Sequence, residues 1–252
     1  MAERKLVKIG VPGFDKLIDK GGIPKGISIL LSGGPGSGKT TFSLQTLAYG
    51  ASQQEKCLYL SFEESEENLK NHMRDYGIDP DWLQNSGYLM IRRLDPFKIS
   101  RSVEALLAKA RGELLIDIDE LDGLIPKGFT PDRIVLDSLS AVAAAFAGKE
   151  EGYRIYIEQL FNALEKIGAT SFLITEINLE ENKFSRTGIE EFLSDGVFAF
   201  YNIRRGNVRV SAVEIIKLRG CSHKKKIVPF SILSGKGIEV YPSENIFVDS
   251  NK

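Results

Sequence analysis

The stretch GGPGSGKTTF, residues 33–42, decides the fold of this chain. Its first eight residues fit the pattern G-x-x-x-x-G-K-[ST]. They follow the continuous apolar run ISILLS at 27–32, and apolar residues with helical spacing continue from them to residue 49. In such a turn the glycines let successive backbone N–H groups point at phosphate oxygens, and the amino terminus of the next helix adds a positive dipole. A strand, a glycine-rich turn and a helix in this order predict a loop that binds nucleotide phosphates.

The side chains at the end of the loop predict how the phosphates are bound. Lys39 is expected to reach the terminal phosphates, and the Thr40 hydroxyl is expected to ligate Mg²⁺. The residues predicted to bind the phosphates are Gly34, Pro35, Gly36, Ser37, Gly38, Lys39, Thr40 and Thr41.

A magnesium ion in such a site needs a second protein partner, usually an acidic residue at the carboxyl end of another buried strand. Asp137 fits this description, because it ends the apolar part of RIVLDSLS at 133–140. An aspartate in this position can also serve only as a helix cap, a role that Ser138 and Ser140 could fill as well. The sequence therefore predicts Asp137 as a metal ligand, with capping as the alternative.

Two glutamates follow the apolar run CLYLSF at 57–62 and could act on the attacking water. Neighbouring residues of a strand face opposite sides, so we expect only one of them, Glu64, to face the phosphate. Glu63 would then support Glu64 or help to hold the metal. The alternative is that both acids serve the amino terminus of the next helix, where Ser65 can act as the cap.

Strands and helices alternate through most of the chain, which predicts a parallel sheet covered on both faces. We expect strands at 27–32, 57–62, 133–137 and 171–178, and helices at 40–49, 65–77, 103–110 and 153–167. The segment 117–131 is interrupted by glycine and proline and is expected to be a surface excursion. From Val197 onward, strand-like runs separated by short polar turns predict an antiparallel ribbon of hairpins at the sheet edge.

The predicted organisation is one α/β domain over residues 1–252. It consists of a lead-in at 1–26, an α/β core at 27–196, a β-hairpin extension at 197–242 and a tail at 243–252.

Composition limits the classes of function. The 33 lysines and arginines nearly balance the 34 aspartates and glutamates, so the chain lacks the overall positive field that draws a protein to nucleic acid or to an acidic membrane. Cys57 and Cys221 are far apart in sequence and are expected to be reduced thiols. No apolar run approaches the about 20 residues of a membrane helix, and the first residues lack the apolar core of a signal peptide. We expect a cytoplasmic protein.

Four stretches of the chain resemble the KaiC-like proteins, a group within the RecA-like ATPases. GVPGFDKLIDKGGIPKG at 10–26 is similar to the lead-in to the phosphate loop of that group, and LYLSFEES at 58–65 to its strand ending in paired catalytic glutamates. IVLDSLS at 134–140 resembles its magnesium strand. IIKLRGCSH at 215–223 resembles its late K-L-R-G-x-S-H signature, which discriminates best because phosphate loops occur in many unrelated ATPases.

The resemblance implies a RecA-like fold, ATP and Mg²⁺ as cofactors, and an active site between the subunits of a homo-hexamer. Lys217 and Arg219 would reach the terminal phosphate of the ATP bound by a neighbouring subunit. Gly220 and His223 would lie close to that nucleotide. Thr175 and Glu176, at the end of a strand, would sense the terminal phosphate, with a simple strand cap as the alternative. Without the resemblance, the stretch around Lys217 would be interpreted as an outward hairpin with solvated lysines.

The sequence departs from the clock proteins of this group in ways that affect function. Those proteins carry two such domains in tandem, and their phosphorylated serine–threonine pair is replaced here by Glu190-Glu191-Phe192, so we expect no autokinase activity. The expected function is a slow, ring-forming ATPase that acts as a regulatory or signalling switch. One alternative is a DNA-binding recombinase or helicase accessory, with Arg204, Arg205, Arg209 and Lys224 to Lys226 lining a channel. Another is a scaffold that binds ATP and barely hydrolyses it.

Overall fold

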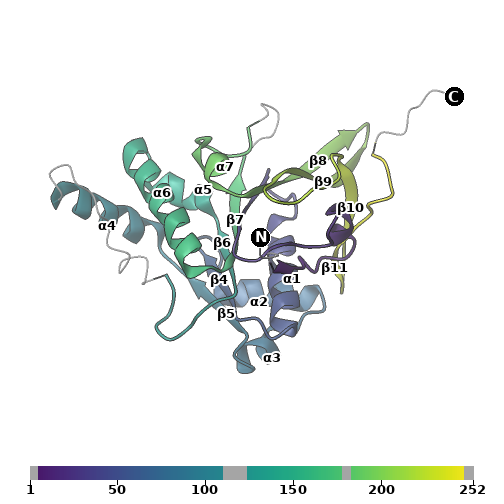
Figure 1. Cartoon of the computed structure of the whole chain (residues 1–252), viewed down its shortest axis with the longest axis horizontal. Coiled ribbons are helices and arrows are strands. Elements are labelled where there is room, and N and C mark those ends of the chain that lie inside the picture. Colours follow the sequence, from purple (N-terminus) through teal and green to yellow (C-terminus); the bar gives the residue numbers. More distant parts are fainter. Residues whose placement is uncertain (1–4, 110–123, 178–182, 247–252) are drawn as a thin grey trace.

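The computed structural model describes residues 5–109, 124–177 and 183–246. A nine-stranded sheet in the order β11-β10-β9-β8-β3-β7-β6-β4-β5 forms the centre of the described chain, with helices on both sides (Figure 1). The strands are β3 (Ser28–Gly33), β4 (Cys57–Ser61), β5 (Leu89–Arg93), β6 (Arg133–Asp137), β7 (Thr170–Glu176), β8 (Gly196–Arg205), β9 (Val208–Leu218), β10 (Val228–Leu233) and β11 (Gly237–Val240). A separate antiparallel pair joins β1 (Leu6–Val7) and β2 (Ile23–Pro24).

The sheet is mostly parallel, as the alternation of strands and helices predicted. Strands β8, β3, β7, β6, β4 and β5 run parallel to one another, and β9, β10 and β11 pair antiparallel beside them. The strand that leads into the glycine-rich loop, β3, lies between β7 and β8, in the middle of the sheet. The carboxyl ends of β3, β4, β6 and β7 therefore meet at one edge, which is where ligands bind in open α/β sheets.

Helices cover the two faces of the sheet with separate apolar cores. The helices are α1 (Lys39–Ser52), α2 (Glu66–Asp75), α3 (Pro80–Asn85), α4 (Pro96–Lys109), α5 (Leu139–Ala145), α6 (Glu150–Ile167) and α7 (Ile189–Leu193), with a 3₁₀ turn at Phe14–Leu17. Ile29 and Leu31 of β3 face the core beneath α1, whereas Leu30 faces the core beneath α6. This alternation is that of a strand buried on both faces.

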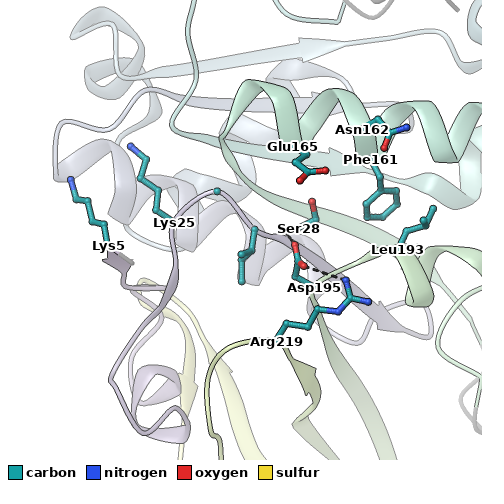
Figure 2. Close-up of a pocket in the computed structure, with 11 residues that line it drawn as sticks. Lys5, Lys25, Ser28, Phe161, Asn162, Glu165, Leu193, Asp195 and Arg219 are labelled. Carbon is teal, nitrogen blue, oxygen red and sulfur yellow. Dashed lines mark hydrogen bonds and ion pairs between the residues drawn. The ribbon is translucent and has the colours of Figure 1, made fainter. Parts of the chain in front are cut away.

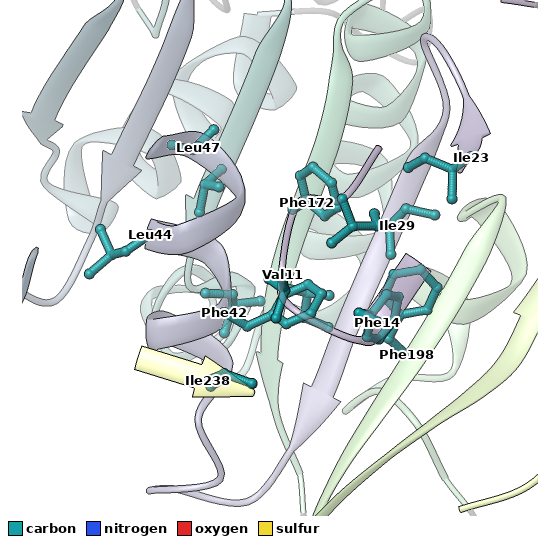
Figure 3. Close-up of a cluster of buried hydrophobic side chains, with 14 of the residues drawn as sticks. Val11, Phe14, Ile23, Ile29, Phe42, Leu44, Leu47, Phe172, Phe198 and Ile238 are labelled. Atoms are coloured by element: carbon teal, nitrogen blue, oxygen red, sulfur yellow. The ribbon is translucent and has the colours of Figure 1, made fainter. Parts of the chain in front are cut away.

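The core beneath α1 is built around aromatic rings and anchors the strand that carries the loop. Phe14 packs against Phe42 of α1 and Phe198 of β8, with ring centroids 5.0 and 4.9 Å apart. Figure 3 shows these rings together with Ile29 of β3 and Ile238 of β11. The lead-in, the loop helix and the last strands thus share one core, and this packing fixes α1 relative to the sheet.

The structure confirms the antiparallel ribbon predicted from Val197 onward, because β8, β9, β10 and β11 pair antiparallel in turn. Strand β8 joins this ribbon to the parallel strands, because its other edge pairs in parallel with β3, with Ile29 opposite Gly196 and Gly33 opposite Phe200. The short turn around Gly206 correctly predicted that β8 and β9 form a hairpin. A hairpin fixes only the relative direction of its own two strands, so it gave no information about which strand lies on the other side of β8.

Several elements differ from their predicted extents. Strand β5 and helix α3 were not predicted, because both are short and amphipathic. Helix α4 begins at Pro96 instead of at Val103, and Ala110 lies outside the described residues. Helix α5 starts directly after β6, where the Ser138 side chain accepts a hydrogen bond from the backbone N–H of Ala141. Residues 117–123 of the predicted surface excursion and Asn178 of the predicted fourth strand also lie outside the described ranges. No helix in these ranges is both long and apolar enough to cross a membrane.

Candidate nucleotide-binding site

The glycine-rich loop folds around the side chain of Lys39. The Lys39 ammonium donates hydrogen bonds to the backbone carbonyls of Gly33 and Gly34, both at 2.8 Å, and contacts the Ser37 hydroxyl at 3.4 Å. Gly38 precedes α1 with φ +94°, a conformation that favours glycine. Burial lowers the pKa of Lys39, and Glu176, whose carboxylate is 3.9 Å away, opposes this effect. The cation is therefore held at the mouth of the loop, beside the amino terminus of α1.

Thr40 and Asp137 meet across the edge of the sheet. The Thr40 hydroxyl donates a hydrogen bond to Oδ2 of Asp137 at 3.0 Å, and the buried Tyr59 hydroxyl donates to the same oxygen at 2.5 Å. Burial raises the pKa of Asp137 to about 6, although the hydrogen bonds from Tyr59 and Thr40 lower it. Ser138 caps α5, so Asp137 is free of the capping role that the sequence left open.

Glu63 and Glu64 both line the cleft, and the expectation that only Glu64 faces the phosphate stays a prediction. Strand β4 ends at Ser61, and the Ser61 hydroxyl accepts hydrogen bonds from the backbone N–H groups of both glutamates, at 3.4 and 2.9 Å. The two residues therefore lie in a turn, where the alternation of a strand no longer applies. The Ser138 hydroxyl donates a hydrogen bond to the Glu63 carboxylate, and His72 lies beside Glu64.

These groups surround one cleft of about 290 Å³. Its lining consists of Gly36, Ser37, Gly38, Lys39, Thr40, Thr41, Glu63, Glu64, His72, Tyr76, Asp137, Ile174, Glu176 and Ile232. Of the residues predicted to bind the nucleotide of their own chain, Gly34, Pro35 and Thr175 lie outside this lining. Thr175 is buried, and its hydroxyl is 3.4 Å from that of Ser140.

Sequence reasoning missed four residues of the cleft lining, His72, Tyr76, Ile174 and Ile232. His72 and Tyr76 are four residues apart, which places them on one face of a helix. The Tyr76 hydroxyl lies 3.3 Å from that of Thr41, next to the phosphate loop. The helical spacing of His72 and Tyr76 could have suggested that these two side chains lie together. Ile232 comes from β10, and no local pattern connects that strand with the loop.

The residues around Lys217 lie at the other end of the sheet. Leu218 of β9 is opposite Gly196, which is itself opposite Ile29 near the start of β3, whereas the phosphate loop begins where β3 ends. Gly220 and His223 follow β9, and His223 forms an isolated bridge with Ile18. One chain therefore does not bring these residues to its own cleft.

Lys217 and Arg219 are bound to the end of α7. The Lys217 ammonium donates hydrogen bonds to the carbonyls of Glu191, Phe192 and Ser194, at 2.9, 3.3 and 2.6 Å. Arg219 donates to the Phe192 carbonyl and pairs with Asp195 at 3.4 Å (Figure 2). Burial lowers the pKa of Lys217, with the Arg219 charge acting in the same direction. Arg219 lines a second cavity, together with Lys5, Lys25 and Glu165.

The donors in the first cleft fit a magnesium ion that a nucleotide brings with it. The described residues contain no group of three or more His, Cys, Asp and Glu side chains arranged to hold a metal by themselves. Mg²⁺ usually keeps several waters and is bound by one or two carboxylates together with substrate phosphates. The hydroxyl of Thr40 and the carboxylate of Asp137, 3.0 Å apart beside the phosphate loop, match this kind of binding.

The loop between β3 and α1, together with the carboxylates at the ends of the neighbouring strands, defines a P-loop nucleotide-binding fold of the RecA-like class. The chain belongs to the KaiC family of ATPases: the family model described as "ATPase: KaiC" matches residues 7–245.

Individual relatives agree with this assignment. The circadian clock protein KaiC3 of Synechocystis sp. is 32% identical over 236 residues, which cover 94% of this chain and 45% of that protein. A UPF0273 protein of Thermotoga maritima is 31% identical over 243 residues, which cover 95% of this chain and 97% of that protein. The crystal structure of a KaiC-like protein from Pyrococcus horikoshii OT3 matches this structure with a TM-score of 0.76 and a sequence identity of 31%. The match covers 95% of this chain and 100% of that chain. The chain thus spans a little less than half the length of the clock proteins that it matches.

Proposed function

We propose that this chain is a Mg²⁺-dependent ATPase that assembles into a ring, hydrolyses ATP slowly and acts as a regulatory or signalling switch. The observation that carries the proposal is that one cleft brings together the buried Lys39, the paired Thr40 and Asp137, and the two glutamates at 63 and 64. Membership of a family of ATPases supports the choice of nucleotide.

Each of these groups has a distinct role in the proposed reaction. Lys39 would bind the terminal phosphates. Thr40 and Asp137 would hold Mg²⁺, which neutralises charge on the phosphate oxygens. Glu64 would orient the attacking water and accept its proton, and Glu63 would support Glu64 or help to hold the metal.

The position of Lys217 and Arg219 supports the ring. Both lie at the end of the sheet opposite the phosphate loop, so they can approach a terminal phosphate only when a second copy of the chain binds it. An arginine supplied in this way can raise the rate of phosphoryl transfer by roughly a thousandfold or more. We therefore expect a homo-hexamer in which Lys217 and Arg219, with Gly220 and His223 nearby, complete the site of the neighbouring subunit.

The segment before β8 supports the expectation that autokinase activity is absent. Glu190 is fully buried, and its carboxylate accepts hydrogen bonds from the hydroxyls of Tyr153 and Thr187, at 2.7 and 2.6 Å. Glu191 accepts a hydrogen bond from the backbone N–H of Phe184 at 2.8 Å. These contacts tie α7 to its surroundings, and neither side chain has a hydroxyl that could accept a phosphoryl group. The proposed output of hydrolysis is a change in shape of the ring.

The first test is ATP turnover, with and without Mg²⁺, by the wild type and by the Glu63→Gln/Glu64→Gln double variant. We expect slow Mg²⁺-dependent turnover that rises with subunit concentration in the wild type. The variant should bind ATP with similar affinity and lack turnover, because its amides cannot accept the proton of water. Turnover that persists in the variant would contradict the assigned roles. Absence of turnover in both proteins would leave a nucleotide-binding scaffold.

A DNA-binding motor is the second candidate, and one observation favours it. Arg204 and Arg209 are directly opposite each other near the tip of the hairpin formed by β8 and β9, and Val208 beside them is exposed. Like charges at paired positions repel each other, and an anionic strand would relieve this repulsion. Repeating the turnover assay with single-stranded DNA separates the two candidates, because strong, salt-sensitive stimulation is expected only of the motor.

A further inference from the structure

Helix α2 lies beside the nucleotide cleft and is fixed there by its packing. The Ser65 side chain caps its amino end by accepting a hydrogen bond from the backbone N–H of Asn68, and Leu69 and Met73 are fully buried in the core. His72 precedes Met73 and lines the cleft. Because the two buried residues fix the rotation of the helix, they also fix the direction from which His72 approaches the cleft.

His72 faces Glu64, the residue proposed to activate water. Its Nδ1 atom is 3.6 Å from Oε2 of Glu64, and the two side chains are 43% and 33% exposed. At 3.6 Å the two atoms are farther apart than in a hydrogen bond, and they form an ion pair when His72 is protonated. Glu63 has a different partner, because the Ser138 hydroxyl donates a hydrogen bond to its carboxylate. Each of the two acids thus has its own partner outside the phosphate loop.

The charges around Glu64 make such a partner necessary. The cleft also holds the carboxylates of Glu63, Asp137 and Glu176, whereas the ammonium of Lys39 is bound to the loop carbonyls. A half-exposed carboxylate among like charges is pushed towards solvent unless a donor or cation holds it. The cost of losing this orientation is large, because a shift of about 1 Å in a catalytic group can reduce a rate about a hundredfold.

We propose that His72 is a positioning residue that holds the Glu64 carboxylate in the direction required for activating water. The inference rests on the proposed ATPase function and adds to it a side chain that acts through Glu64. His72 affects the rate and leaves ATP affinity unchanged, because Lys39 and the loop bind the phosphates.

The test compares steady-state turnover and ATP binding for the wild type, His72→Ala and His72→Asn. Asparagine keeps an N–H donor close to the place of Nδ1. We expect His72→Ala to lower kcat about tenfold to a hundredfold with KM and ATP affinity unchanged within about twofold, and His72→Asn to restore most of the rate. Asn68→Ala, at an exposed position of the same helix, is the matched control and should behave like the wild type. Thermal unfolding of each variant verifies that α2 remains folded.

The possible outcomes separate this inference from the proposed function. A wild-type rate in His72→Ala, an increase in KM with kcat unchanged, or equal losses in the alanine and asparagine variants would each overturn the positioning role while the ATPase function stands. If His72→Ala does not fold, the asparagine variant and His72→Gln decide, because both keep a donor and should keep turnover within a few-fold of the wild type. A wild type without turnover would overturn the ATPase function and the inference together.

Discussion

At the scale of single residues, the site depends on keeping one buried carboxylate ionised. Asp137 lies at the end of a strand where burial raises its pKa to about 6, and the carboxylates of Glu63 and Glu64 act in the same direction. The hydroxyls of Tyr59 and Thr40 oppose this shift by donating hydrogen bonds to Asp137. A protonated Asp137 is a poor ligand for Mg²⁺, so these two hydroxyls favour the form that the proposed reaction needs.

Replacing Tyr59 with phenylalanine should make Mg²⁺ binding more sensitive to pH. The variant loses a hydrogen bond that lowers the pKa of Asp137, so that pKa rises further and a larger fraction of Asp137 is protonated near neutral pH. We expect the Mg²⁺ concentration for half-maximal turnover to rise several-fold at pH 6.5, and the difference from the wild type to disappear at higher pH, where Asp137 is ionised in both. Tyr201→Phe, which removes a tyrosine–carboxylate hydrogen bond to Glu214 outside the lining of the cleft, is the control. Equal Mg²⁺ requirements at pH 6.5 would contradict the prediction.

At the scale of elements, the last strand of the sheet is tied to the helix of the phosphate loop through Gln45. The Gln45 amide donates hydrogen bonds to the carbonyls of Lys236 and Ile238, at 3.0 and 3.3 Å, and its oxygen accepts one from the Ile238 N–H at 2.6 Å. Gly237 has φ +78°, and a Cβ atom there would lie 2.6 to 2.8 Å from the Gln45 amide. These contacts join α1 to the hairpin of β10 and β11.

Gln45→Ala should destabilise the protein, because it leaves the buried N–H of Ile238 without a partner. We expect the free energy of unfolding to fall by about 1–3 kcal/mol. Urea unfolding followed by circular dichroism measures this change. Gln53→Ala, at the exposed end of the same helix, is the matched control and should change stability by less than about 0.5 kcal/mol. A similar effect of the two substitutions would show that the contact between α1 and β11 is not important for stability.

At the scale of the whole molecule, the two ends of the sheet carry different halves of the proposed active site. The cleft with Lys39 and Glu64 lies where the parallel strands end, and Lys217 and Arg219 lie where they begin. A head-to-tail ring places one half against the other in every interface. In the single protomer, Lys217 and Arg219 bind backbone carbonyls of their own chain.

Two inactive variants should therefore restore activity when they are mixed. In a ring that combines Glu64→Gln with Arg219→Ala, some interfaces join an intact Glu64 to an intact Arg219, and random mixing in equal amounts gives about one quarter of such interfaces. We expect turnover approaching a quarter of the wild-type rate after the subunits are mixed at low concentration and assembled with ATP. A mixture of Glu64→Gln with Lys39→Ala should stay almost inactive. In that mixture, no subunit has a cleft in which Lys39 and Glu64 are both intact. Equal turnover rates in the two mixtures would argue against an active site that is shared between subunits.

The local pattern of the sequence was sufficient for the fold class and for the strand, loop and helix around Lys39. The glycine spacing before Lys39, the apolar run before it and the helix after it together predicted a strand, a loop and a helix in a mostly parallel sheet. Asp137 was predicted as a second partner because it ends another apolar run, and the structure places it 3.0 Å from Thr40. The fold prediction succeeded because burial on both faces of a strand and the backbone conformation of glycine are properties of short segments, whereas the metal-binding role of Asp137 stays a prediction.

The tertiary structure alone decided which side chains beyond the strand ends enter the cleft. Past the end of β4 the alternation of a strand is lost, and both Glu63 and Glu64 line the cleft from a turn held by hydrogen bonds to Ser61. His72 reaches Glu64 through the packing of α2, and β8 lies beside β3 through pairing between residues far apart in sequence. Contacts of this kind depend on how whole helices and strands pack around a shared core. The hydrophobic periodicity of the local sequence therefore does not predict them.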